Sequence, residues 1–434
     1  MERKAYQQLV EWKNHPSRKP LILNGARQVG KTWLLKEFGR REYQNMAYIN
    51  CDHNEQMQSI LSEGFDMPRI LRNLSALTNV DIQPGKTLII LDEVQSVVGG
   101  IPSLKYFCEN APQYHVAVAG SLLGIQLHRG ESFPVGKVQM MTLYPMSFGE
   151  YLLAKGEGMK KKLLDEPDYS IWSAIGSAYT DLLRQYYFTG GMPAAVEAFI
   201  EGESLHAVRN IQKQILADYA ADFSKHAPGN EVPRIKMVWN SIPSQLAREN
   251  RKFIYGAIKS GARAKDFELA IQWLIDCGLA YMIPRVSKAA MPLKFYEDFQ
   301  AFKLYLVDIG LMGALVDTPA EKILIGADIF EEYKGAFTEQ YVLQQMVSVE
   351  DTHIYYYSTP DSRTEVDFVI QRGCSVVPIE VKAEENLRAK SLRQLVTSNP
   401  GLHGLRFSMS GYREQEWMTN IPLFGVESEV SRIR

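Results

Sequence analysis

The stretch LILNGARQVGKTWLLKEF, Leu21–Phe38, decides the fold of the first part of the chain. Within it, GARQVGKT at Gly25–Thr32 matches the pattern G-x-x-x-x-G-K-[ST]. Glycines are required there because the backbone must curl tightly for its N–H groups to face phosphate oxygens. The apolar residues before the loop predict a strand, and Trp33–Phe38 predict a helix whose positive N-terminus faces the phosphates. The stretch therefore predicts a phosphate-binding P-loop.

The side chains of this loop predict ATP or ADP and Mg²⁺ as ligands. We expect Lys31 to contact the β- and γ-phosphates and the Thr32 hydroxyl to take one position on Mg²⁺. The predicted nucleotide-binding residues of this stretch are Gly25, Ala26, Arg27, Gln28, Val29, Gly30, Lys31, Thr32 and Trp33.

A second apolar run, Thr87–Leu91, ends in two acidic residues about 60 positions after the P-loop. We expect it to form a neighbouring strand of the same sheet, with Asp92 in the metal shell and Glu93 orienting and deprotonating the attacking water. This pair suits water activation better than phosphoryl transfer to a small acceptor, which disfavours a metabolic kinase. After a strand at His115–Ala119, Ser121 is expected beside the γ-phosphate or the water, with a plain Gly-Ser turn as the alternative.

The composition of the chain limits its class and its partners. The chain has 434 residues, of which 46% are hydrophobic and 23% charged, as in folded globular proteins. With 48 basic and 50 acidic residues the net charge is -2, so any DNA contact must be local. Isolated cysteines, no secretory signal pattern and no apolar run near the ~20 residues that span a bilayer lead us to expect a cytoplasmic protein without a membrane partner.

The tail predicts a second catalytic site. Asp367 is followed thirteen positions later by Glu380-Val381-Lys382, and each acidic residue lies at the edge of an apolar strand. The strand period of two places Glu380 and Lys382 on one face. Two carboxylates on adjoining strands can hold Mg²⁺, and a lysine beside them can position or activate water. An amphipathic edge strand gives the same pattern, and a retained but idle nuclease fold is a further alternative.

Two residues on predicted helices extend this second site. Glu339 precedes the strands and is expected to complete the metal ligands with Asp367 and Glu380. Gln394 follows the strands and is a weaker candidate.

The middle of the chain predicts helices and then a hairpin. Helical patterns run from Ser147 to about Phe223, and a helix near Ala264–Cys277 precedes β-rich runs at Leu279–Val286 and Leu293–Val307, which suggests a winged helix. Its basic residues offer a local contact for DNA phosphates, with a solvated face as the alternative. They are Arg248, Arg251, Lys252, Lys259, Arg263 and Lys265.

Several motifs together carry a family resemblance over nearly the full length. They are GARQVGKT at 25–32, LIILDEVQ at 88–95, AGS at 119–121, LYPMSFGEYL at 143–152, TGGMP at 189–193, FKLYLVDIGLM at 302–312 and EVDFVI at 365–370. With them the chain resembles a prokaryotic branch of AAA-type ATPases, in which an AAA-like module precedes a C-terminal domain of unknown function that is restriction-endonuclease-like, of the PD-(D/E)xK type.

The resemblance also bears on individual residues. Gly191-Met192-Pro193 is similar to the GxP element that signal-transduction ATPases place over the nucleotide, so Pro193 is expected to sense adenine or phosphate; a helix-breaking turn is the alternative. The family places an arginine after a glycine where this chain has Gly136-Lys137, and lysine lacks the bidentate fork of arginine. Arg129 is the substitute candidate for an arginine finger.

Together these observations predict an α/β protein with four parts. We expect a P-loop AAA-type ATPase core at 1–145, a helical lid at 146–225, a winged-helix-like module at 226–318 and a PD-(D/E)xK nuclease-like domain at 319–434. The expected function is ATP hydrolysis coupled to a Mg²⁺-dependent nuclease acting on DNA. The alternative is a nucleotide-dependent switch whose nuclease-like domain only binds nucleic acid or protein. The sequence is compatible with a homo-oligomer.

Overall fold

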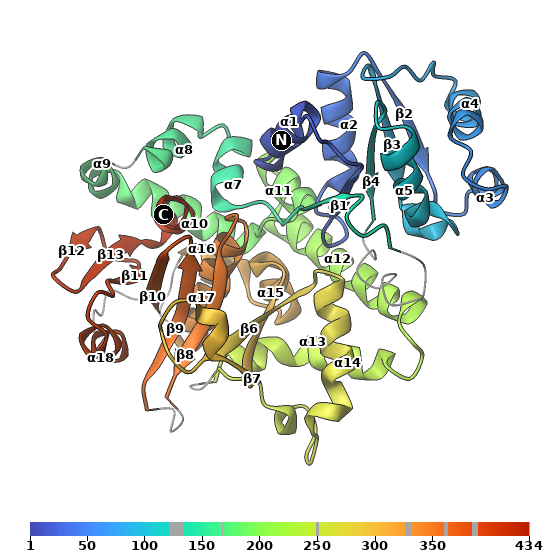
Figure 1. Cartoon of the computed structure of the whole chain (residues 1–434). Coiled ribbons are helices and arrows are strands. Elements are labelled where there is room, and N and C mark those ends of the chain that lie inside the picture. Colours follow the sequence, from blue (N-terminus) through green and yellow to red (C-terminus); the bar gives the residue numbers. More distant parts are fainter. Residues whose placement is uncertain are drawn as a thin grey trace. The chain divides into compact units, whose positions relative to one another are not determined.

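The chain divides into two compact units. The structure, a computed structural model, describes residues 1–120, 133–166, 168–248, 251–325, 331–359, 363–383 and 389–433 (Figure 1). Glu2–Tyr144 and Asp276–Gly278 form the N-terminal unit, whereas Pro145–Ile275 and Leu279–Arg434 form the C-terminal unit together with Met1. The predicted lid therefore groups with the tail of the chain.

The N-terminal unit contains a parallel sheet of five strands in the order β2-β3-β4-β1-β5. Its strands are β1 (Leu21–Asn24), β2 (Asn45–Asn50), β3 (Thr87–Asp92), β4 (His115–Ala119) and β5 (Gln139–Thr142). The strands β1, β3 and β4 and their place in one sheet confirm the sequence prediction. However, β1 pairs with β4 and β5, so the prediction that β3 neighbours β1 was wrong. The short edge strand β5 was not predicted.

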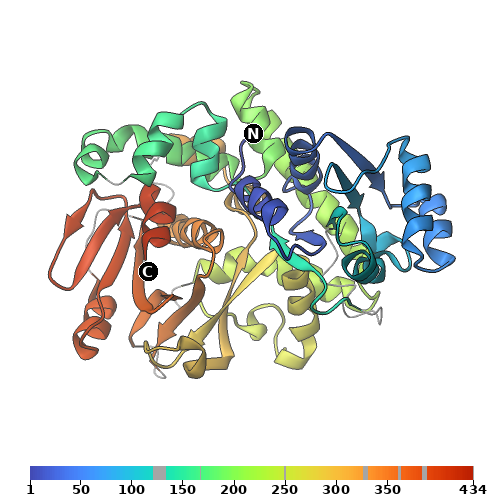
Figure 2. The same cartoon turned by 45° about the horizontal axis from the view of Figure 1, so that its top comes forward.

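Helices cover both faces of this sheet (Figures 1 and 2). They are α1 (Ala5–Asn14), α2 (Lys31–Glu42), α3 (Glu55–Ser62), α4 (Met67–Thr78) and α5 (Gly100–Asn110), with the 3-10 turn η1 (Val94–Ser96). On one face, α3 to α5 pack apolar side chains on Ile89 and Leu91 of β3. On the other, Gly39 of α2 lies against Leu88 and Met46. All six residues of β3 are buried, because both faces are covered.

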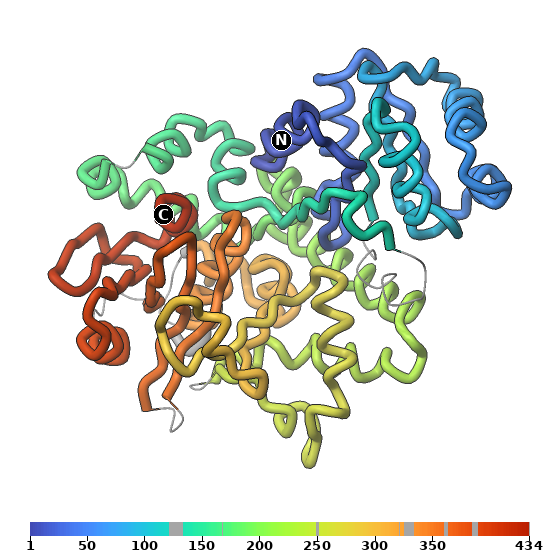
Figure 3. Tube along the Cα trace, viewed as in Figure 1, coloured from blue at the N-terminus to red at the C-terminus, as the bar shows by residue number. Residues whose placement is uncertain are grey.

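The C-terminal unit begins with a series of helices, green in the chain trace of Figure 3. They are α7 (Phe148–Ala154), α8 (Gly158–Asp165), α9 (Tyr169–Ala174), α10 (Gly176–Thr189), α11 (Pro193–Ile200) and α12 (Leu205–His226). A capping box begins α7, where the Ser147 side chain accepts from the Glu150 N–H and the Glu150 side chain accepts from the Ser147 N–H. These helices and the break at Gly190–Pro193 confirm the predicted pattern.

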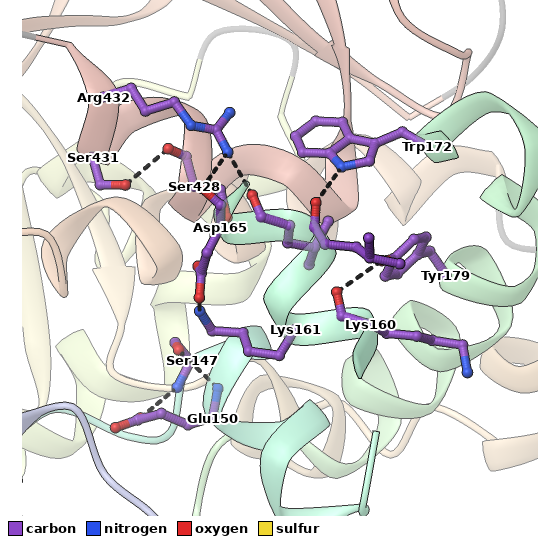
Figure 4. A network of polar contacts seen from close by, with 12 residues as sticks. Ser147, Glu150, Lys160, Lys161, Asp165, Trp172, Tyr179, Ser428, Ser431 and Arg432 are labelled. Atoms are coloured by element: carbon purple, nitrogen blue, oxygen red, sulfur yellow. Dashed lines mark hydrogen bonds and ion pairs between the residues drawn. The ribbon is translucent and has the colours of Figure 1, made fainter. Parts of the chain in front are cut away.

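The last helix of the chain contacts this helical series. Arg432 of α19 (Val426–Arg432) donates to the carbonyls of Leu164 and Asp165 at the end of α8 (Figure 4). Trp172 donates to Leu163 O at 3.0 Å, which fixes α9 on the same helix. These contacts explain why the helices after residue 145 belong to one unit with the tail.

The C-terminal unit also contains an eight-stranded mixed sheet, in the order β12-β13-β11-β10-β9-β8-β6-β7. Its strands are β6 (Ala280–Val286), β7 (Glu297–Leu306), β8 (His353–Ser358), β9 (Glu365–Arg372), β10 (Ser375–Lys382), β11 (Gly404–Ser408), β12 (Arg413–Glu414) and β13 (Met418–Pro422). The predicted hairpin is present as β6 and β7, which pair antiparallel. Because β6 also pairs with β8, the predicted boundary at 318 and 319 lies between strands of one sheet.

Helices precede the strands of this sheet or connect them along the sequence. They are α13 (Val232–Leu246), α14 (Ala264–Asp276), α15 (Ile309–Leu315), α16 (Ala320–Ile325), α17 (Glu331–Val347) and α18 (Lys390–Ser398), with 3-10 turns η2 (Tyr255–Ala257), η3 (Leu293–Tyr296) and η5 (Leu423–Gly425). Leu392 and Leu395 of α18 enter a core with Tyr355 and Val369. The predicted helices that carry Glu339 and Gln394 and the predicted strands that carry Asp367 and Glu380 are confirmed, whereas β11 to β13 were not predicted. Over the described part of the chain, no helix has the length and apolarity needed to cross a bilayer.

Candidate active sites

The P-loop connects β1 to α2 as the sequence predicts. Gly25 has φ 138° and Gly30 has φ 96°, and a Cβ on Gly25 would lie 2.2 Å from Leu143 O. Only glycine fits a position with that backbone and so close a neighbour. Gln28 also has a positive φ, of 64°. Strained non-glycine residues gather at ligand-binding loops, so this backbone is consistent with a binding function.

Lys31 is the first residue of α2 and is buried. Its Nζ donates to Gly25 O at 2.7 Å and to Ala26 O at 2.8 Å. Burial lowers the pKa of Lys31 to about 8, although Glu93 and Asp92 oppose that shift. A cation is therefore held within the loop and close to the acidic pair.

Asp92 and Thr32 meet at the end of β3. The Thr32 hydroxyl donates to Asp92 Oδ2 at 2.7 Å, and the Tyr48 hydroxyl donates to the same oxygen at 3.0 Å. Burial, together with Asp92, raises the pKa of Tyr48 to about 12, so that its hydroxyl stays protonated and keeps donating. Although β4 separates β1 from β3, the first turn of α2 thus reaches the carboxylate predicted to bind metal.

The residue after Asp92 takes an unusual backbone conformation. Glu93 has φ 50° and ψ 42°, in the left-handed region, and its carboxylate accepts from the Gln95 amide. Such a conformation costs of order 1–3 kcal/mol for a non-glycine residue and is found preferentially at active sites.

These residues fit a magnesium nucleotide. A hydroxyl and a carboxylate are hard oxygen donors, and Mg²⁺ in nucleotide sites takes one or two protein ligands, with phosphate and water supplying the others. Within the ranges that the structure describes, no three His, Cys, Asp or Glu side chains form a metal-binding group. Thr32 and Asp92 are suited by their oxygen donors to a metal ion that arrives with phosphate ligands.

Two contacts of this site were missed by sequence reasoning. Arg3 is buried and donates to Val29 O at 2.8 Å and to Tyr144 O at 2.6 Å, so it supports the P-loop from outside the motif. Tyr48 is the second. Neither lies in a recognisable pattern, since each acts through a contact with residues distant in the sequence.

Several predicted residues have a position but no demonstrated role. Trp33 is 44% exposed on the first turn of α2, and Lys137 pairs with Glu109 at 2.9 Å. Ser121 and Arg129 lie outside the described residues. Pro193 is the first residue of α11 in the C-terminal unit, and its contact with nucleotide stays a prediction.

The Gly190–Gly191 turn before α11 contacts a buried carboxylate of the same unit. Asp308 Oδ2 accepts from Gly191 N at 2.6 Å and from Gln344 Nε2 at 2.8 Å, and Oδ1 accepts from Leu311 N at 3.0 Å. A Cβ on Gly190 would lie 2.1 Å from Asp308 Oδ1. Burial raises the pKa of Asp308, and the hydrogen bonds counteract that effect. The network joins the motifs TGGMP and FKLYLVDIGLM and accounts for both glycines.

The predicted second site assembles in the C-terminal unit. Asp367 lies on β9, Glu380 and Lys382 lie on the adjoining strand β10, and Glu339 lies on α17. Asp367 Oδ2 accepts from Val381 N at 2.7 Å, and Lys382 Nζ pairs with Glu380 Oε1 at 2.7 Å. The structure thus brings the predicted residues of the two strands together, with Glu380 and Lys382 paired.

The charged groups in this cluster shift the pKa values of their neighbours. Burial raises the pKa of Glu380 to about 7, and the nearby Asp367 carboxylate adds to the shift. Burial alone would lower the pKa of Lys382, but Glu380 and Asp367 raise it above its usual value. Gln394, the weaker candidate, accepts from the Thr364 hydroxyl at 3.0 Å.

An arginine joins Glu339 to this cluster. Arg251 Nη1 pairs with Glu339 Oε1 and lies 3.3 Å from Asp367 Oδ1. This placement contradicts the prediction that Arg251 is one of the residues free to contact DNA phosphates, because its guanidinium has two buried carboxylates as partners. As arranged, the carboxylates do not fit a metal ion, and their role as metal ligands stays a prediction.

Comparison with known proteins assigns the N-terminal part of the chain. Residues 17–152 match the family described as AAA domain. Residues 180–322 and 334–424 match two domains of unknown function, DUF8612 and DUF4143. No curated protein matches the chain.

Three solved structures are similar to this chain. The Walker-type ATPase PABY2304 of Pyrococcus abyssi is 14% identical, with a TM-score of 0.47 over 73% of this chain and 95% of that chain. The Aeropyrum pernix ORC1 protein in complex with DNA is 16% identical, with a TM-score of 0.27 over 72% and 91%. The S. cerevisiae Hsp104–ADP complex is 11% identical, with a TM-score of 0.28 over 63% and 38%.

The family match covers β1, the P-loop and the acidic end of β3, which are the elements that hold Lys31, Thr32 and Asp92 together. Residues 17–152 of this chain are therefore an AAA-type P-loop ATPase domain.

Proposed function

We propose that this chain hydrolyses ATP at Lys31, Thr32, Asp92 and Glu93, and that the nucleotide state controls a nuclease-like domain acting on DNA. The observation that carries the first part is the hydrogen bond of 2.7 Å from Thr32 Oγ1 to Asp92 Oδ2, beside the buried Lys31 ammonium. It places a hydroxyl, a carboxylate and a cation at the start of one helix. A cation at a helix N-terminus suits phosphate, and a hydroxyl with a carboxylate suits the Mg²⁺ that accompanies it.

The chemistry assigned to each residue follows from its position. Lys31 would exchange its two carbonyl partners for the β- and γ-phosphate oxygens, and the N-terminus of α2 adds partial positive charge. Thr32 and Asp92 would hold Mg²⁺, which neutralises charge on the phosphates. Glu93, which directly follows Asp92 in a left-handed turn conformation, would accept a proton from the attacking water.

The nuclease-like part of the proposal rests on the C-terminal cluster. Asp367 and Glu380 lie on adjoining strands, and Lys382 is paired with Glu380. Exposed cations at Lys259, Arg263 and Lys265, before and at the start of α14, would provide local attraction for DNA phosphates. The partition into ATPase core, lid, winged-helix-like module and nuclease-like domain belongs to the same proposal.

One observation favours a second candidate function, a nucleotide-dependent switch without cleavage. Arg251 is paired with both Glu339 and Asp367, so the carboxylates already have a cation. In a switch, ATP turnover would change the affinity of the C-terminal unit for nucleic acid or protein, and the cluster would only stabilise the fold.

Supercoiled plasmid distinguishes the two candidates. The full chain is incubated with plasmid and Mg²⁺, with and without ATP, beside Asp367→Ala, Lys31→Ala and the exposed control Glu416→Ala. The proposal expects nicking that is lost in Asp367→Ala, retained in Glu416→Ala and changed by ATP only when Lys31 is intact. Ordinary ATP hydrolysis without nicking would favour the switch, and nicking that survives Asp367→Ala would contradict the assignment of the site.

A further inference from the structure

The cluster around Asp367 contains a cation of its own. Arg251 comes from the connection between α13 and η2, more than 80 residues before Glu339 in the sequence. Its Nη1 pairs with one oxygen of Glu339 and approaches Asp367 Oδ1. The Arg251 side chain is 23% exposed, whereas those of Glu339 and Asp367 are 1% and 12% exposed. The guanidinium therefore lies at the outer side of two nearly buried carboxylates.

The surroundings of Arg251 are shaped to admit its guanidinium. A Cβ on Gly335 of α17 would lie 2.7 Å from Arg251 Nη2, so glycine at this position leaves the space that the side chain takes. The other oxygen of Glu339, Oε2, accepts from the Tyr305 hydroxyl at 2.9 Å. Glu339 is thus held from the inside by Tyr305 and from the outside by Arg251.

A divalent cation and this guanidinium need the same oxygens. Two cations a few ångströms apart repel each other strongly when water is largely excluded. Conversely, Glu339 and Asp367 would be costly to leave unpaired, because nearly buried carboxylates lose their hydration. Lys303 Nζ lies 4.0 Å from Glu339 Oε2 and pairs with Glu365, so it does not take the place of Arg251 at Glu339 Oε1 and Asp367 Oδ1. Those two oxygens are the ones for which the guanidinium and a divalent cation would compete.

We propose that Arg251 is an internal cation that occupies the carboxylate site, and that it must leave Glu339 and Asp367 before a divalent metal ion binds there. The inference rests on the proposed assignment of Glu339, Asp367 and Glu380 as metal ligands, and it adds the condition under which they could serve as such. In this structure the second site is therefore closed to metal ions by a side chain of the protein itself.

Two substitutions act on the guanidinium by different means. Arg251→Gln deletes the positive charge. Gly335→Ala keeps the charge but places a Cβ 2.7 Å from Arg251 Nη2, so the end of the arginine must shift from its place between the two carboxylates, and alanine is favoured in a helix. Matched controls are Arg184→Gln, which removes an exposed arginine of the same unit, and Gly176→Ala, where a Cβ meets nothing within 4 Å.

The test measures Mn²⁺ binding to the full chain without nucleotide, by electron paramagnetic resonance of free Mn²⁺. Each variant is compared with its double mutant carrying Asp367→Asn, so that only binding that depends on Asp367 is counted. We expect Arg251→Gln and Gly335→Ala to bind Mn²⁺ in this way about tenfold or more tightly than the wild type, and the controls to resemble the wild type. ATP turnover and thermal melting show which variants fold. If Arg251→Gln does not fold, the Mn²⁺ affinity of Gly335→Ala tests the proposal.

Metal binding and cleavage give separate answers. Mn²⁺ binding gained without plasmid nicking supports the inference and contradicts the proposed nuclease function. Wild-type binding that depends on Asp367 and equals that of the variants overturns the inference, whether or not DNA is cleaved. Absence of such binding from every folded variant overturns it as well.

Discussion

The protonation state of Lys31 is expected to have a large effect on nucleotide affinity. Burial lowers the pKa of this ammonium to about 8, because few groups replace the water that it loses. Its partners in the structure are two carbonyls, which carry no net charge. Phosphate oxygens do carry charge, so nucleotide binding would favour the protonated form.

Nucleotide affinity should therefore fall as the pH rises from 7.5 to 9.5. Below a pH of about 8 Lys31 already carries its proton, whereas above it binding must take up a proton, and affinity decreases by up to about tenfold per pH unit. Lys31→Arg should remove most of this slope, because a guanidinium stays charged. Titration with a fluorescent ATP analogue at each pH measures the affinity of the wild type and of Lys31→Arg. An unchanged wild-type affinity across this range would contradict the assignment of Lys31.

The sequence correctly predicted that Lys31, Thr32 and Asp92 come together, because they lie in one loop and at one strand end, whereas their contact with nucleotide stays a prediction. It did not predict Arg3 or Tyr48, whose contacts depend on how separate segments pack. It also predicted Arg251 as a surface cation, since charge patterns carry no information about a partner 116 positions away.

At the scale of elements, the turn between α10 and α11 depends on two glycines. A Cβ on Gly191 would lie 2.1 Å from Met146 O, and Gly191 N donates to Asp308. The turn thus connects the start of α7 to the start of α15, where Asp308 is the N-cap. Both neighbours are backbone or buried groups that have little freedom to move.

Gly191→Ala should destabilise the C-terminal unit by about 3 kcal/mol, because the added methyl group must displace the Met146 carbonyl or break the Asp308 hydrogen bond. Gly176→Ala, at the start of α10, has open space around it and should change stability by less than about 0.5 kcal/mol. Urea denaturation, monitored by circular dichroism, compares the free energies of unfolding of the two variants. Equal midpoints for the two variants would show that the turn tolerates a side chain.

Elements with strong local patterns were predicted correctly, and those defined by pairing were not. The apolar runs of β1, β3 and β4 are continuous, as expected for strands with both faces covered. In contrast, the four residues of β5 alternate between half-buried and exposed, and the two residues of β12 are both exposed. The pairing of β6 with β8 joins segments about 70 residues apart, and no local pattern specifies it.

At the scale of the whole molecule, the candidate sites lie in different units. Lys31, Thr32 and Asp92 belong to the N-terminal unit, whereas Asp367 and Glu380 belong to the C-terminal unit. The chain passes between the units at Tyr144–Pro145, and residues 276–278 of the later sequence belong to the N-terminal unit. Control of one site by the other would have to act through such connections, which the plasmid experiment with Lys31→Ala examines.

The central claim, that residues 17–152 hydrolyse ATP with Glu93 as the base, is tested most directly by release of the γ-phosphate from labelled ATP. We predict that Glu93→Gln keeps nucleotide binding but lowers turnover by about 10²–10⁴-fold, that Lys31→Ala loses binding, and that the exposed control Glu11→Gln behaves as the wild type. Turnover at the wild-type rate in Glu93→Gln, or turnover that survives Lys31→Ala, would contradict the account.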